Sequence, residues 1–166
     1  MNSPRSEQDE IHLRIGEFVV SFGKVAYLLE RLLGVLTDEE ENVWIKPFFI
    51  DDLMVGRVLD KISKTAKVRL HDNQTLLDEL KDTIRKIRDI QQNRNKVVHG
   101  EWLIDSTGRC PTKLRNYRLR WENGCWQYLD DKVMTPTKVK SLSTKSKELA
   151  VDLKNITSKI EAEQKQ

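Results

Sequence analysis

Hydrophobic residues recur every three or four positions over four long stretches of the chain, which is the spacing of one face of an α-helix. The stretches run from about Glu7 to Leu36, from about Asp51 to Leu70, from about Gln74 to Val98 and from Pro136 to about Glu161. Because such helices bury one apolar face each, the pattern favours an antiparallel, up-and-down helical bundle. The predicted core-facing residues are, in chain order, Ile11, Ile15, Phe18, Val19, Phe22, Val25, Leu29, Leu32 and Leu36; Leu53, Met54, Val58, Leu59, Ile62 and Ala66; Leu76, Leu77, Leu80, Ile84, Ile87 and Ile90 or Gln91; and Val139, Leu142, Leu149, Leu153, Ile156 and Ile160.

Polar residues and glycine mark the ends of these helices. Ser6 is placed to cap the first helix, and acidic residues in its first turn favour the helix dipole. Asp72 or Asn73 can cap the third helix, and Gly100 stands where a C-terminal glycine stop is expected.

Between the third and fourth helices the pattern changes to a period of two, which is that of a β-strand. Asn123-Gly124 is a strong hairpin signal, and a two-residue loop there pairs the flanking residues in a defined register. The expected pairs are Glu122 with Cys125, Trp121 with Trp126 and Leu119 with Tyr128. The expected fold is therefore all-α: a bundle of four main helices with a small β-hairpin inserted at about residues 102–132. It forms a single domain, residues 7–163, after a disordered lead-in, residues 1–6.

The 166 residues suffice for one domain with its own core. No apolar run is long enough to span a membrane, and the N-terminus lacks the apolar region of a secretory signal. Cys110 and Cys125 lack a C-x-x-C spacing, so neither a zinc site nor a disulfide scaffold is expected. These features predict a cytoplasmic protein without a metal or another cofactor.

Charge is unevenly distributed along the chain. Residues 1–60 carry 6 Lys and Arg against 12 Asp and Glu, a net charge of −6, whereas residues 61–120 carry 15 against 7, a net charge of +8. A basic middle third favours a polyanionic partner such as RNA. The alternative is that the basic helices pair with the acidic first helix inside the bundle.

The end of the third helix carries an arginine, an asparagine and a histidine in the order R-N-x-x-x-H, at Arg94, Asn95 and His99. This segment resembles the motif of HEPN domains. The resemblance implies an all-α bundle and a metal-independent endoribonuclease whose cleft forms at the interface of a homodimer. It also implies association with toxin–antitoxin or phage defence systems, with RNA and a cognate antitoxin protein as partners.

The residue types suit this chemistry. Histidine transfers protons near neutral pH, and arginine presents a planar, permanently charged fork to a phosphate. Asn95 would orient the phosphate or the imidazole, and a two-fold dimer would supply the second His99 that separate acid and base steps need. On an ideal helix Arg94 and His99 lie ~140° apart, so either the helix ends before His99 or each side chain reaches the cleft from a different side.

Structural roles are the alternatives for these two side chains. His99 can interact with the last carbonyls of the helix. Arg94 can pair with Asp89, with Glu101 or with an acid of the first helix.

Further basic residues are candidates for contacts with the RNA backbone: Arg88 and Lys96 beside the motif, and Arg118 and Arg120 on the hairpin. The hairpin's aromatic residues suit stacking on single-stranded RNA, or they pack on the bundle instead. The alternative functions are a non-catalytic HEPN-like module that binds RNA, nucleotide or a protein partner, and a plain helical interaction protein.

Overall fold

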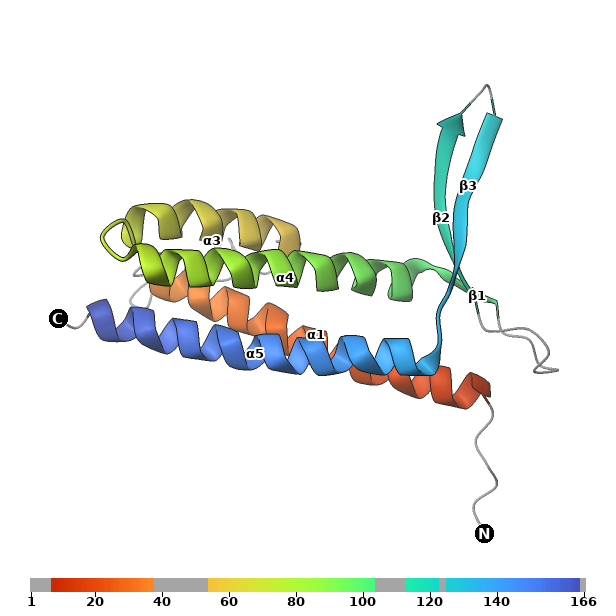
Figure 1. The fold of residues 1–166 in the computed structure, drawn as a ribbon, viewed down its shortest axis with the longest axis horizontal. Coiled ribbons are helices and arrows are strands. Elements are labelled where there is room, and N and C mark those ends of the chain that lie inside the picture. The colour runs from red at the N-terminus through yellow and green to blue at the C-terminus, as the bar shows by residue number, and fades with distance from the viewer. Residues whose placement is uncertain (1–6, 38–53, 104–112, 123–124, 165–166) are drawn as a thin grey trace, which may run out of the picture.

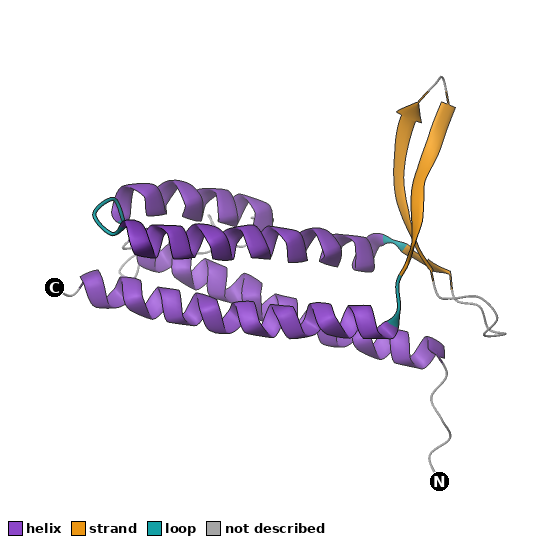
Figure 2. Ribbon diagram, in the orientation of Figure 1, coloured by secondary structure: helices purple, strands orange, loops and turns teal. Residues whose placement is uncertain are grey.

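The computed structural model describes residues 7–37, 54–103, 113–122 and 125–164 of the 166-residue chain. Its helices are α1 (Glu7–Thr37), α3 (Val55–Arg69), α4 (Gln74–His99) and α5 (Pro136–Gln164), and its strands are β1 (Glu101–Leu103), β2 (Lys113–Glu122) and β3 (Cys125–Val133). The helices form one bundle, and the strands lie at the end of it where α4 finishes (Figures 1 and 2). The predicted bundle of four main helices is confirmed; Ser6 lies outside the described residues.

Side chains at the helix ends explain where α4 and α5 begin. The side-chain oxygen of Asn73 accepts a hydrogen bond of 3.0 Å from the backbone N–H of Leu76, which makes Asn73 the N-cap of α4. Pro136 is the first residue of α5, where a missing N–H costs nothing. Gly100 follows α4 with φ −86° and ψ 158°, so this glycine ends the helix in an extended conformation. The left-handed conformation typical of a glycine stop is absent there.

The helix directions differ from the up-and-down order. Arg31 pairs with Glu161 at 2.9 Å while Ser21 Oγ lies 2.9 Å from Ser143 Oγ, so α1 and α5 run parallel. The Arg69 side chain donates to the carbonyl of Leu36, which places the C-terminal ends of α1 and α3 together (Figure 1).

Only α4 runs opposite to the other described helices. The up-and-down prediction is therefore wrong, and the length of the first connection is the reason. Sixteen residues separate α1 from Met54, and an extended chain of that length reaches ~50 Å, enough to return along the bundle before α3 starts.

One apolar stripe from each helix builds the core. Phe18, Leu59, Ile87 and Leu153 are fully buried examples, one from each helix. Two predicted core residues are wrong: Val19 is 36% exposed, and Met54 is 77% exposed because it precedes the first turn of α3. Among the described helices, none combines the length and the apolar character that crossing a membrane requires.

The three strands form an antiparallel sheet in the order β1-β2-β3. Near the bundle, Trp102 of β1 pairs with Leu114 of β2, and Leu114 is buried in the core. The outer part of the hairpin stands away from the helices (Figure 1). Its register has Leu119 opposite Tyr128, Trp121 opposite Trp126 and Glu122 opposite Cys125.

We expect Leu153→Ala to lower the free energy of unfolding by about 2–5 kcal/mol, because it leaves a cavity in the core. Leu153 is fully buried, whereas Val151 on the same helix is 56% exposed. Val151→Ala is therefore the matched control and should change stability by less than ~0.5 kcal/mol. Urea denaturation measures both values, and similar losses for the two variants would contradict the assigned core.

Candidate nucleic-acid interface

The basic residues in the first two thirds of α4 are engaged by nearby acids. Asp78 accepts from Lys81 at 2.8 Å, and Asp82 pairs with both Arg85 and Lys86. The hydrogen bond from Lys86 is the main reason that the pKa of Asp82 lies below its usual value. These pairs lie along one helix, so much of the basic charge of this segment is compensated locally.

The ion pairs of α3, α4 and α1 bear on two predictions from the sequence: that Arg88 contacts RNA, and that basic helices pair with the acidic first helix. Arg88 donates to Asp60 of α3 at 2.7 Å, so its guanidinium already holds a carboxylate partner and is a weaker candidate for RNA than its charge suggests. The acidic residues Glu10 and Glu17 of α1 pair with Arg14 on their own helix. None of these pairs joins a basic residue of α4 to an acidic residue of α1.

Arg94 occupies a core-facing position of α4. It follows the fully buried Ile87 by seven residues, about two turns, and therefore lies on the same face of the helix. The side chain is half-buried. Position 56 of α3 lies beside Gln91, where an added Cβ would be 3.5 Å from the Gln91 amide nitrogen. The last two turns of α4, which carry Arg94, thus extend past the first turn of α3 (Figure 1).

Asn95 is the neighbour of the Arg94 guanidinium, which donates a hydrogen bond of 3.3 Å to its side-chain oxygen. Within the described part of the chain, Arg94 forms no ion pair with Asp89 or Glu101, so that structural role is not observed. The structure thus brings Arg94 and Asn95 together. The Arg94 side chain is partly exposed, and its partner is a neutral amide at the long distance of 3.3 Å.

His99 is the last residue of α4 and is exposed. The helix continues through it, so the ~140° separation from Arg94 on an ideal helix applies. The chain therefore presents the guanidinium and the imidazole on different sides of the same helix. Lys96, half-buried, adds a second basic residue to the last turn.

Other groups cap the end of α4. The Trp102 indole N–H donates to the carbonyl of Val97 at 3.0 Å, and the Gly100 N–H donates to the carbonyl of Lys96 at 2.9 Å. These bonds satisfy carbonyls that a helix end leaves open. Among the described residues, no hydrogen bond joins the His99 imidazole to these carbonyls, whereas its interaction with the helix dipole stays an alternative.

The hairpin carries Arg118 and Arg120 on β2, of which the structure describes the backbone. The pairing of β2 with β3 is irregular between Asn116 and Leu119. Successive side chains therefore alternate regularly between the two faces of the sheet only from Leu119 to Glu122. The outer strands stand clear of the bundle in Figure 1, which disfavours packing of that part of the hairpin on the helices.

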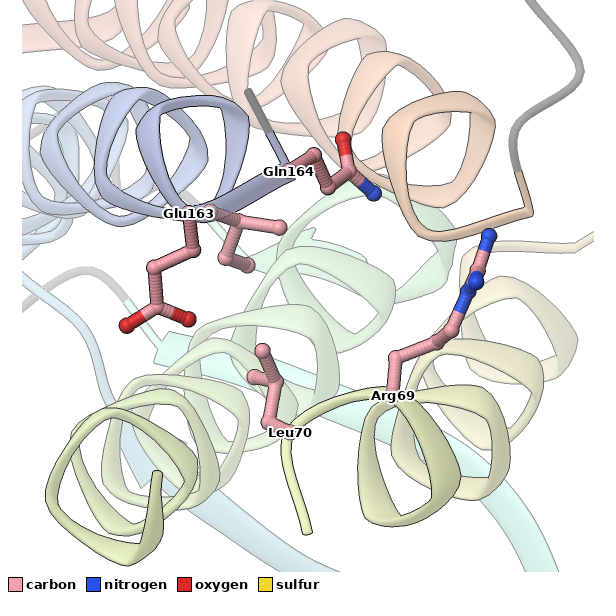
Figure 3. A pocket seen from close by; sticks show the side chains of 5 residues that line it. Arg69, Leu70, Glu163 and Gln164 are labelled. Atoms are coloured by element: carbon pink, nitrogen blue, oxygen red, sulfur yellow. The ribbon is translucent and has the colours of Figure 1, made fainter. Parts of the chain in front are cut away.

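A pocket among the described residues lies at the opposite end of the bundle from Arg94. It has a volume of about 230 Å³ and is lined by Arg69, Leu70, Ile160, Glu163 and Gln164 (Figure 3). Arg69 and Gln164 donate to the last carbonyls of α1, and Asn73 donates to Glu163. The pocket is smaller than typical ligand sites, and its polar groups join helix ends.

No cluster of three or more potential metal ligands occurs among the residues that the structure describes. Comparisons with protein-family models, with curated proteins and with solved structures find no match to this chain. The HEPN resemblance therefore stays a prediction that rests on the residues of the motif.

Sequence analysis overlooked two features of this site. Arg94 takes the next position of the apolar stripe of α4 after Ile87 and Ile90. A charged residue at a core-facing position often marks a functional site, and the spacing of the apolar residues is enough to find it. The capping role of Trp102 had no such signal, because it depends on the fold of the chain after Gly100.

We expect Arg94→Met to leave the free energy of unfolding unchanged or to raise it by up to ~1 kcal/mol, because it completes an apolar stripe without removing an ion pair. Arg88→Met is the control at an exposed ion pair and should change stability by less than ~0.5 kcal/mol. Guanidinium unfolding measures both. A loss of more than ~1 kcal/mol for Arg94→Met would instead assign Arg94 a structural role.

Proposed function

We propose that this protein is a metal-independent endoribonuclease of the HEPN type. Its site is formed by Arg94, Asn95 and His99 at the end of α4 and is completed by the same residues of a second copy. The observation that carries the proposal is the position of the half-buried residue Arg94 on the core-facing side of the helix, with a guanidinium that hydrogen-bonds an exposed amide rather than an acid. A bound phosphate would supply the anionic partner that this guanidinium lacks among the described residues.

The proposed reaction is a transesterification within the RNA. One His99 takes the proton of a ribose 2′-hydroxyl, and the oxygen attacks the adjacent phosphorus. The bond to the 5′-oxygen breaks, and His99 of the partner subunit donates a proton to that oxygen. The products are a 2′,3′-cyclic phosphate and a free 5′-hydroxyl. The nucleophile is the RNA's own 2′-hydroxyl, so the step uses no water molecule. Arg94 neutralises the charge on the crowded phosphorane, and Asn95 positions Arg94.

The hairpin has a place in this proposal. Arg118 and Arg120 lie on the strand that stands away from the bundle beside the end of α4, where they would contact the RNA backbone together with Lys96. A toxin or defence role, with a cognate antitoxin, is proposed from the HEPN resemblance alone.

A non-catalytic RNA-binding module is the second candidate. The observation that favours it is the continuity of α4 through His99, which separates the imidazole from Arg94 on one protomer. Without a second copy at this end of the bundle, no proton donor would lie opposite the base. The two candidates differ in whether bound RNA is cut.

The experiment is cleavage of a labelled single-stranded RNA in the presence of a metal chelator. We expect cleavage by the unaltered protein and a decrease of about 10²–10⁴-fold for His99→Ala, which removes the proton-transfer group. His12→Ala is the matched control, because His12 is an exposed histidine on α1. Equal cleavage by all three proteins would reveal a contaminating nuclease and reject the site. RNA binding without cleavage would support the second candidate.

A mixing experiment tests the composite site. Because each site would draw His99 from both subunits, an excess of the His99→Ala variant should inhibit the unaltered protein by forming mixed dimers with impaired sites. An excess of His12→Ala should not inhibit. If activity stays proportional to the unaltered protein under both conditions while subunits exchange, each site is built within one chain.

A further inference from the structure

The outward face of α1 carries exposed apolar side chains at a regular spacing. Leu13, Val20 and Tyr27 follow one another at intervals of seven residues and are 38%, 76% and 65% exposed. On an ideal helix Val20 points about 160° away from the fully buried Phe18, so the stripe faces away from the core. An apolar heptad repeat of this kind is typical of a helix that pairs with another helix.

Two glycines lie between these apolar residues on the same stripe. The order Leu13, Gly16, Val20, Gly23 and Tyr27 steps by three and four, which is the spacing of the two core positions of a coiled coil. A Cβ at position 16 or 23 would meet no atom of the described residues within 4 Å. The glycines therefore serve no visible packing need inside the bundle, and each offers a hollow to a large side chain.

Charged residues follow one edge of the stripe, also at intervals of seven. They are Glu10, Glu17, Lys24 and Arg31, two acids followed by two bases. This order is antisymmetric about the middle of the stripe. Two such helices placed side by side in opposite directions would bring each acid next to a base: Glu10 next to Arg31, and Glu17 next to Lys24.

We propose that the outward face of α1 binds the same face of a second copy of this chain, with the two helices antiparallel. In one register two of the three large residues meet glycines, because Val20 packs against Gly23 of the partner subunit and Tyr27 packs against the partner's Gly16. Leu13 lies opposite the partner's Glu30 at the two ends of this contact. The same register places Glu17 beside the partner's Lys24. Size and charge thus select the same alignment independently, and each contact occurs twice because the pair is two-fold symmetric.

The charged edge can form these pairs alongside its contacts within the chain. Glu17 accepts from Arg14 at 3.0 Å, and Arg31 donates to Glu161 at 2.9 Å. A carboxylate has about four acceptor sites and a guanidinium five donors, so each retains capacity for a partner. The opposite edge carries Val19 and Ala26, which would extend the apolar contact.

This inference does not depend on the proposed ribonuclease. The face points away from the bundle, whereas α4 packs on the core side of α1 with α3 and α5. The contact would therefore leave the Arg94 ends of the two protomers on the outside of the dimer. A composite ribonuclease site would need a separate contact at the end of α4, and a chain that uses both surfaces would assemble beyond a dimer.

Charge reversal tests the register. Glu17→Lys alone and Lys24→Glu alone each place like charges at both symmetric contacts, so each should weaken self-association by roughly tenfold or more. An equimolar mixture of the two variants restores opposite charges at both contacts and should form heterodimers. Sedimentation equilibrium at low salt measures all three. Failure of the mixture to associate more tightly than either variant would overturn the antiparallel register.

Glycine replacement tests the close contact. Gly23→Gln should preserve or raise thermal stability at dilute, monomeric concentrations, because glutamine favours a helix and meets no atom within the described chain. The same change should weaken self-association, since it fills the hollow for Val20 of the partner subunit. Lys64→Gln, at an exposed position of α3, is the control and should not affect association. A protein that stays monomeric at all concentrations, or a Gly23→Gln variant that associates normally, would overturn the proposal.

Discussion

The parallel packing of α1 against α5 is the contact on which the rest of the structure depends. It includes the buried Ser21–Ser143 pair in the first third of α5 and the Arg31–Glu161 ion pair near the end of α5. This contact fixes the rotation of α1 about its axis: Phe18 and Val25 face the core, and Val20 and Tyr27 therefore face outward. Because α3 is short and begins beside Gln91, the described helices at the end of the bundle that carries the last turns of α4 are α1, α4 and α5.

The candidate site at the end of α4 follows from that architecture. A helix can carry a charged residue on its core-facing side only where its neighbours leave room, and Arg94 lies past the start of α3. Trp102 and Gly100 donate to carbonyls in the last turn of α4, which ends at the exposed His99. The site and the outward face of α1 thus lie on different sides of the bundle, and they would serve different contacts.

Much of the fold could be predicted because helix periodicity and caps are local. The boundaries of α4 and α5 lie within a few residues of those expected from Asn73, Gly100 and Pro136. Val19 and Met54 could not be placed correctly, since apolar spacing alone cannot tell a residue at the edge of a stripe from one at its centre. For the site, the spacing of Arg94, Asn95 and His99 can be seen in the sequence. The pairing of Arg88 with Asp60 could not be predicted, because it requires α3 and α4 to pack together.

By itself, the sequence determined the existence and approximate length of the helices and the charge of each segment, because these depend on residues close together along the chain. The tertiary structure decided the directions of the helices and the rotation of α1. Helix direction depends on which helices pack side by side, and helix rotation depends on which of several apolar positions finds a partner. Both are set by packing between residues far apart in sequence, which local spacing does not encode.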